Sequence, residues 1–280
     1  MIQFPVIVTF ANQKGGVGKT TLCVLFAHYL VAKGVKVRIL DCDRQMSVVR
    51  RRKADIDRYG EEAVPFPADP ERVSNAEEVY DMVEKIFGNQ DYEVTLIDTP
   101  GLVLNEPNKL ILQNSDLIVT PFHYDKMTLS STSTFIMCLD MMKRTLGQEM
   151  RARLYLIPNL HDGRIGTRSE LMLWEEARDI FSRYGVVTPK ISRVSSMERI
   201  STVMPLDQQL KLVTPAFDKL YLDIFGSLEQ FRMSPKSTIE QKTTEKPVIT
   251  EMIPELTDTD APSDLNFETD NNTTTDGKPE

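Results

Sequence analysis

The chain has 280 residues, of which 41% are hydrophobic and 26% charged, and its formal net charge is −8. These values allow one large α/β domain or two small ones, with a core of good size. No apolar stretch approaches the roughly 20 residues needed to cross a bilayer, so we expect a cytoplasmic protein without a transmembrane segment. The three cysteines lie far apart and include no C-x-x-C pair, so the sequence suggests neither a disulfide framework nor a thiolate metal site.

Short apolar runs alternate with helical patterns along the first 231 residues. This alternation predicts an α/β fold with a doubly wound, mostly parallel sheet and helices on both faces, in one domain over residues 1–231. Ligands of such a sheet bind at the carboxyl ends of its strands. The expected strands lie near residues 5–11, 36–41, 93–98, 116–121, 153–158 and 187–191, and the expected helices near 20–33, 45–58, 74–87, 126–146, 167–184 and 214–231.

A glycine-rich octet at residues 14–21, Lys-Gly-Gly-Val-Gly-Lys-Thr-Thr, stands between the first expected strand and the first expected helix. Glycines let successive backbone N–H groups turn inward, and the helix start adds the positive end of its dipole. Lys19 and Thr20 suit phosphate and Mg²⁺. We therefore expect a nucleoside triphosphate, bound with Mg²⁺ by Gly15, Gly16, Val17, Gly18, Lys19, Thr20 and Thr21.

The octet departs from the usual phosphate-binding pattern, because Gln13 stands where that pattern requires glycine and a second lysine, Lys14, follows it. In this respect it resembles the deviant Walker A loop of the ParA/MinD family of ATPases. The resemblance implies that the nucleotide is ATP and that a homodimer forms around it. It also implies that Lys14 reaches the nucleotide of the partner subunit.

Two acidic motifs follow expected strands, Asp41-Cys-Asp43 after the second and Asp98-Thr-Pro-Gly101 after the third. The resemblance assigns Asp43 to positioning the attacking water, Asp41 to supporting Mg²⁺ and its waters, and Asp98 to binding Mg²⁺ through water. The residues alone leave ordinary alternatives open. Asp41 or Asp43 could cap the following helix, and Asp98-Thr-Pro-Gly101 could be a plain turn.

Two later residues are assigned to the adenine side of the site by the same resemblance. Asn159 ends an expected strand where several relatives use an asparagine to read the adenine edge. Pro205 resembles the segment that packs over the base. An asparagine before a loop is also typical of a turn, so this alternative stays open for Asn159.

DNA is the macromolecular partner that the resemblance implies, because ParA proteins that partition DNA bind it without sequence preference as ATP dimers. Association with the nucleoid and an activating partner protein follow from the same comparison. Phosphate neutralisation needs several cations on one face. The candidates are Arg193, Arg199, Lys211 and Lys219, although each alone also suits a solvated surface.

The strongest local positive patch is the run Arg50-Arg-Arg-Lys53, within the second expected helix. Steps of about 100° per residue spread these four side chains over most of the helix circumference, so no single DNA-reading stripe is predicted. One interpretation is an exposed helix whose cations pair with the carboxylates of Asp55, Asp57, Glu61 and Glu62. The other is a contact with nucleic acid or a partner.

Residues 232–280 differ in character, with 11 acidic side chains, 5 basic ones and a single aromatic, Phe267. Such a segment cannot bury enough apolar surface to offset its ordering entropy, which predicts a disordered acidic Thr/Pro-rich tail. The alternative is a partner-binding segment at residues 247–254.

Together, these motifs and the resemblance they carry imply a slow, partner-stimulated, Mg²⁺-dependent ATPase switch of the ParA type. It would position DNA or a macromolecular complex in plasmid or chromosome partition, or in conjugative transfer. Residues 45–59 are similar to ParA-type proteins of conjugative elements from Bacteroides-like bacteria. One alternative is a MinD-like positioning ATPase that acts through a protein or membrane partner, although the acidic tail lacks the basic amphipathic helix of MinD. The other is a non-hydrolysing nucleotide-bound scaffold, against which Asp43 argues.

Overall fold

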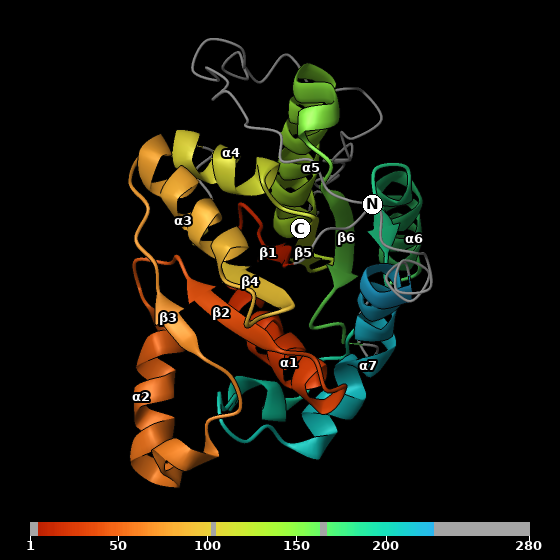
Figure 1. Cartoon of the computed structure of the whole chain (residues 1–280). Helices are drawn as coiled ribbons and strands as arrows, with labels where there is room; N and C mark the ends of the chain where they lie inside the picture. Colours follow the sequence, from red (N-terminus) through yellow and green to blue (C-terminus); the bar gives the residue numbers. More distant parts are fainter. Residues whose placement is uncertain (1–4, 102–104, 163–166, 227–280) are drawn as a thin grey trace, which may run out of the picture.

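The computed structural model describes residues 5–101, 105–162 and 167–226. Within them lies a seven-stranded sheet with the order β3-β2-β4-β1-β5-β6-β7, in which every strand pairing is parallel (Figure 1). The predicted α/β fold with a parallel sheet is therefore confirmed. The strands are β1 (Val6–Phe10), β2 (Val37–Asp41), β3 (Ala68–Pro70), β4 (Val94–Asp98), β5 (Leu117–Phe122), β6 (Arg153–Pro158) and β7 (Val186–Val187).

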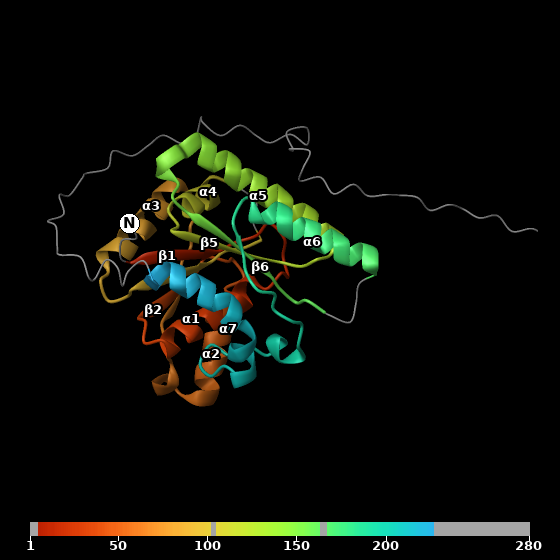
Figure 2. The same cartoon turned by 90° about the vertical axis from the view of Figure 1, so that its right-hand side faces the viewer.

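Helices cover both faces of the sheet (Figures 1 and 2). On one face, α1, α2 and α7 pack around a cluster that includes Phe26 and Phe217. On the other face, α3 to α6 bury Val79, Leu139 and Phe181 against the sheet. The α-helices are α1 (Lys19–Ala32), α2 (Ser47–Tyr59), α3 (Ala76–Gly88), α4 (Glu106–Gln113), α5 (Lys126–Leu146), α6 (Arg168–Ser182) and α7 (Asp207–Tyr221).

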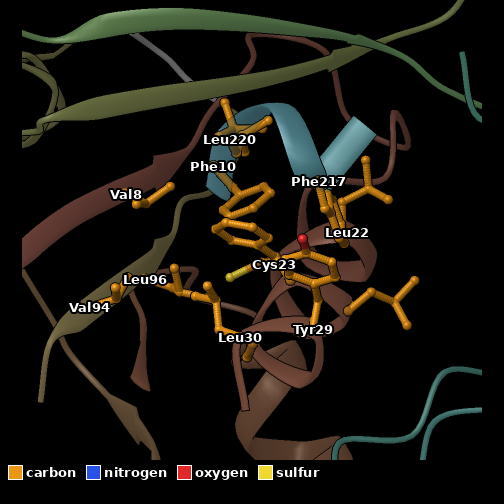
Figure 3. Close-up of a cluster of buried hydrophobic side chains, with 14 of the residues drawn as sticks. Val8, Phe10, Leu22, Cys23, Tyr29, Leu30, Val94, Leu96, Phe217 and Leu220 are labelled. Carbon is orange, nitrogen blue, oxygen red and sulfur yellow. The ribbon is translucent and has the colours of Figure 1, made fainter. Parts of the chain in front are cut away.

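The core around α1 fixes where that helix begins. Every residue of α1 from 22 to 30 is buried, which is typical of a helix enclosed between a sheet and a second helix. Figure 3 shows Phe10 of β1, Leu96 of β4 and Phe217 of α7 gathered around α1. The rings of Phe26 and Phe217 meet edge to face with centroids 4.9 Å apart. The start of α1 is therefore held at the carboxyl end of β1.

Four elements differ from the sequence prediction. β3 and α4 were not predicted, because Ala68-Asp-Pro70 contains no apolar run and α4 has only eight residues. β7 covers two residues instead of five. α7 begins at Asp207 instead of near 214 and continues through Pro215, since the Leu206 backbone N–H donates to Gln209 Oε1 at 2.9 Å and fixes the earlier start.

Parts of the prediction lie outside the described residues, namely positions 227–231 of the last expected helix and the tail at 232–280. Within the described ranges, no helix combines the length and the apolar character needed to cross a membrane.

The sheet order places the loop after β1 at the topological switch point of the sheet. β1 and β5 are neighbours, and the chain leaves β1 toward β2 on one side but leaves β5 toward β6 on the other. Connections that diverge in this way open a crevice at the carboxyl ends of the two strands, which is where doubly wound sheets bind ligands.

Candidate functional site

The loop between β1 and α1 has a backbone shape that only glycine adopts easily. Gly16 and Gly18 have φ angles of +77° and +97°, in the left-handed region. A Cβ atom on Gly18 would lie 2.3 Å from Nδ2 of Asn159, so the close neighbour also requires glycine. No side chain caps the start of α1, and its first turn contains no acidic residue. The N–H groups of this helix start therefore offer a site to an anion.

Lys19, the first residue of α1, folds back over the loop. Its side-chain ammonium donates to the Lys14 carbonyl at 3.3 Å, and the residue is only 7% exposed. Burial lowers the pKa of Lys19, while the carboxylates of Asp98 and Asp43 oppose this shift by favouring the charged form. A buried cation at an uncapped helix start, with its charged form favoured by two carboxylates, is well placed to bind phosphate oxygens.

Asp98 ends β4, directly beside the ends of β1 and β2 in the sheet register. Its carboxylate is fully buried, and Oδ2 accepts a hydrogen bond from Thr20 Oγ1 at 2.7 Å. Burial raises the pKa of Asp98 to about 7, an effect that the Thr20 hydroxyl and Lys19 partly oppose. The other oxygen, Oδ1, has no hydrogen-bond partner among the described residues. A buried, unpaired carboxylate oxygen next to a hydroxyl fits the oxygen-ligand preference of Mg²⁺.

Asp41 holds the start of α2. Its Oδ2 accepts the backbone N–H groups of Val48 and Val49, and its Oδ1 accepts that of Asp43. The structure therefore shows the capping role that the sequence left open for Asp41, while a role in supporting Mg²⁺ stays a prediction.

Asp43 lies closer to solvent than Asp41. Its Oδ1 accepts the backbone N–H of Gln45 at 2.9 Å. Its charge opposes the lowering of the pKa of Lys19 and contributes to the raised pKa of Asp98, so the carboxylate lies within electrostatic range of both. This position is compatible with orienting a water molecule, a role that also stays a prediction.

Asn159 is nearly fully buried against the phosphate loop. Its Nδ2 donates to the Val17 carbonyl at 2.9 Å, and its Oδ1 has no partner within the described part of the chain. In this structure the side chain therefore supports the loop, and the adenine contact remains a prediction. Pro205 is half-buried beside the segment that contacts α2. The predicted role of Lys14 across a dimer is likewise untested, and its backbone N–H donates to Asn12 Oδ1 at 3.2 Å.

Two polar residues at this edge were not predicted. Asn12 joins the loop to β5 and α5, because its Nδ2 donates to the Pro121 carbonyl at 2.8 Å and to Thr132 Oγ1 at 3.1 Å. His123 follows β5, and its Nε2 has no hydrogen-bond partner among the described residues. Burial lowers the pKa of His123, while the nearby Val17 backbone opposes this shift. The signal that could have found both is their position immediately after strands whose carboxyl ends border the loop.

The four DNA-binding candidates are all exposed, and their role in binding DNA stays a prediction. Arg193 acts electrostatically on His123, near the phosphate loop. Arg199 lies against the first turns of α7, because Gln209 Nε2 contacts its carbonyl at 3.4 Å. Lys211 and Lys219 stand on α7, about 12 Å apart along the helix axis.

The basic run on α2 differs from the predicted salt-bridged helix. Arg52 and Asp55 are buried, at 6% and 8% exposure, whereas the rest of the run is exposed. None of the carboxylates proposed as partners makes an ion pair with α2 in the described residues. The ion pairs found in the described residues all lie on other elements: His123–Asp125, Arg144–Asp140 and Arg153–Asp223.

The parallel sheet and this loop define a class. A glycine loop between the first strand and an uncapped helix, followed by a lysine, a threonine and a buried aspartate on a neighbouring strand, is the phosphate-binding site of a P-loop nucleotide-binding protein. Residues 8–203 match the model of the CobQ/CobB/MinD/ParA nucleotide binding domain, and the chain belongs to this family.

Named relatives include the chromosome-partitioning ATPase Soj of Thermus thermophilus, which is 26% identical over 180 residues, covering 56% of this chain and 70% of Soj. A Borrelia burgdorferi plasmid partition protein bound to AMPPNP is 20% identical with a TM-score of 0.57, covering 77% of this chain and 99% of that one. Pyrococcus horikoshii MinD complexed with Mg-ADP is 16% identical with a TM-score of 0.53, covering 77% and 95%. The two structural comparisons bear on the fold.

Proposed function

We propose that the chain is a Mg²⁺-dependent ATPase of the ParA type, which forms a homodimer around ATP and acts as a slow switch that positions DNA or a macromolecular complex. One observation carries the proposal: at the uncapped start of α1, Thr20 donates a hydrogen bond to the buried Asp98, and the charges of Asp98 and Asp43 act on Lys19. The relatives support it, since Soj is named a chromosome-partitioning ATPase and the Borrelia protein was solved with AMPPNP.

The residues divide the chemistry among themselves. Lys19 and the backbone N–H groups of residues 15–21 bind the phosphates, and Thr20 and Asp98 hold Mg²⁺. The bound Mg²⁺ neutralises phosphate charge. Asp43 orients the attacking water, which is the main task left to the protein because phosphoryl transfer depends on positioning more than on covalent chemistry.

The same proposal covers the dimer, the domain boundaries along the chain and the partners. Lys14 acts on the nucleotide of the partner subunit, and Asn159 and Pro205 contact the adenine. Residues 1–231 form the ATPase domain, and the acidic segment 232–280 is a separate tail. An activating partner protein stimulates hydrolysis, and DNA binding associates the dimer with the nucleoid. The process served is partition or conjugative transfer.

Three variants test the site. ATP binding and phosphate release are measured for Lys19→Ala, for Asp43→Ala and for Asp57→Ala, a control that removes an exposed carboxylate of α2. Lys19→Ala is expected to lose ATP binding. Asp43→Ala is expected to bind ATP, to lose about 100-fold or more in turnover, and to accumulate as an ATP-bound dimer. Asp57→Ala should match the wild type.

Each other outcome is informative. Equal turnover by the wild type and Asp43→Ala would refute the role of Asp43. A wild type that binds ATP but stays monomeric in size-exclusion chromatography would refute the dimer switch. A wild type that binds ATP and never hydrolyses it, with or without DNA, would favour the scaffold alternative.

A further inference from the structure

The outward-facing side of α2 is strongly cationic. Arg50, Arg51, Lys53 and Arg58 are all exposed, and steps of about 100° per residue place them within an arc of roughly 160° on the helix. One carboxylate, Asp57, shares this arc. We call these four cations the outer α2 face. From the sequence, the four residues of the basic run were expected to cover most of the helix circumference. In the structure Arg52 is buried, and the other three are exposed on one side of the helix.

The fourth member, Arg52, points the other way and anchors the helix. Its guanidinium donates to the Phe66 carbonyl at 2.5 Å and to Thr202 Oγ1 at 3.0 Å. Asp55, one turn further on, accepts the Thr202 backbone N–H at 2.6 Å and the Ser201 hydroxyl at 3.1 Å. Because these contacts fix the inner side of α2, the outer α2 face is held in one orientation before any ligand binds.

The chemistry of the outer α2 face selects its ligand. None of its four cations forms an ion pair in the described ranges. Among the described residues, every large hydrophobic side chain that is exposed lies on an element other than α2. A protein partner needs an apolar or aromatic centre to its interface, and a membrane-bound helix needs an apolar face. A cationic surface that includes one carboxylate, Asp57, and no large exposed hydrophobic side chain fits the repeated phosphates of a nucleic acid backbone.

Arg199 lies at the edge of this surface. Arg199 is exposed and stands three residues before Thr202, whose backbone N–H donates to Asp55 of α2. Figures 1 and 2 show α2 and the segment leading into α7 on the same face of the sheet. We infer that the outer α2 face, with Arg199 at its edge, binds DNA phosphates without reading sequence. This inference rests on the proposed function for the presence of DNA as a partner.

The test uses the full chain with ATP bound and a fluorescent DNA duplex of mixed sequence, with affinity measured by anisotropy between 50 and 300 mM salt. Changing Arg50, Arg51 and Lys53 to Ala together should weaken binding at 100 mM salt on the order of 100-fold. The slope of log affinity against log salt should also fall by about 2.7, or 0.9 for each of the three phosphates that is no longer neutralised. Changing Arg50 and Arg51 to Lys keeps the charges and should retain the slope.

The control removes the same charge elsewhere, by changing Arg168, Arg178 and Arg183 to Ala at exposed positions on and next to α6. These changes should leave the salt slope as in the wild type. ATP hydrolysis and dimer formation should be unchanged in every variant, because none of these residues belongs to the proposed ATP site.

The possible failures can be told apart. If the wild type binds DNA and the Arg50, Arg51 and Lys53 variant binds it with the same slope, the inference is wrong and the proposed function stands. If the ATP-bound wild type binds no DNA, both the inference and the DNA partner of the proposed function are wrong. If the variant with Lys at 50 and 51 loses as much affinity as the Ala variant, charge is not the cause, and the inference is again wrong.

Discussion

His28 gives the fold a predictable loss of stability in acid. The residue is 5% exposed on α1, its Nε2 lies 3.0 Å from the Ser201 carbonyl, and its ring packs edge-on against Phe66 with centroids 5.0 Å apart. Burial, helped by the charge of Arg52, lowers the pKa of His28 from 6.5 to about 4, although the Ser201 carbonyl and Asp55 partly oppose the shift. Protonation would place a second buried cation beside Arg52.

The sign and size follow from the two pKa values. The unfolded chain binds this proton near pH 6.5 and the folded chain only near pH 4, so the stabilisation is complete above pH 6.5 and is lost as the pH falls. The whole shift corresponds to about 3.4 kcal/mol, at about 1.36 kcal/mol per pKa unit. Between pH 7 and pH 5 the loss should be about 2 kcal/mol.

Urea unfolding at pH 7 and pH 5 measures this loss, with His28→Gln as the comparison. Glutamine can donate to the Ser201 carbonyl but does not titrate. Between pH 7 and pH 5, the free energy of unfolding of His28→Gln should therefore fall by about 2 kcal/mol less than that of the wild type. The control His161→Gln removes a more exposed histidine, whose pKa is also lowered by burial and by Lys190, and it should keep most of the wild-type loss. An equal loss of stability in the wild type and His28→Gln would refute the reasoning.

Two paired substitutions test other contacts. Asp55→Ala should lower the free energy of unfolding by about 3 kcal/mol, because the Thr202 N–H loses its buried acceptor, whereas Asp57→Ala at the surface should change it by no more than about 0.5 kcal/mol in urea titrations. Gly18→Ala should abolish ATP binding in a fluorescent-nucleotide assay, because its φ of +97° and the neighbouring amide exclude a Cβ. Gly34→Ala, at a φ of +78° with open space around it, should lower the free energy of unfolding by only about 1–2 kcal/mol and retain ATP binding. Loss of ATP binding in both variants would contradict this reasoning.

The fold could be predicted wherever an element carries its own pattern. β1, β4 and β5 are buried on both sides and read as continuous apolar runs, which is how strands of a covered parallel sheet read. β3 has no such run, because it is a three-residue edge strand that pairs with β2 alone. Its presence depends on where the chain after α2 returns, which is set by tertiary contacts.

Some contacts of the candidate site could be predicted from the sequence, and others could not. Lys19, Thr20 and Asp98 could be predicted to meet, because each follows or ends a strand whose carboxyl end is at the same edge. The capping role of Asp41 could not be chosen over a metal role, since it depends on the path from β2 into α2. The contact of Asn159 with the Val17 carbonyl likewise depends on how closely two loops approach.

The basic run on α2 shows what a composition-based interpretation misses. Val48, Arg52 and Asp55 follow the i, i+4, i+7 spacing of a buried helix face, but two of the three are charged, so a search for apolar positions passes over them. A charged pair is stable at such positions only when neighbouring backbone satisfies it, as Thr202 does here. Because Arg52 turns inward, the remaining cations are concentrated on one side. The same side-chain contact thus explains both the stability of α2 and the positive surface it presents.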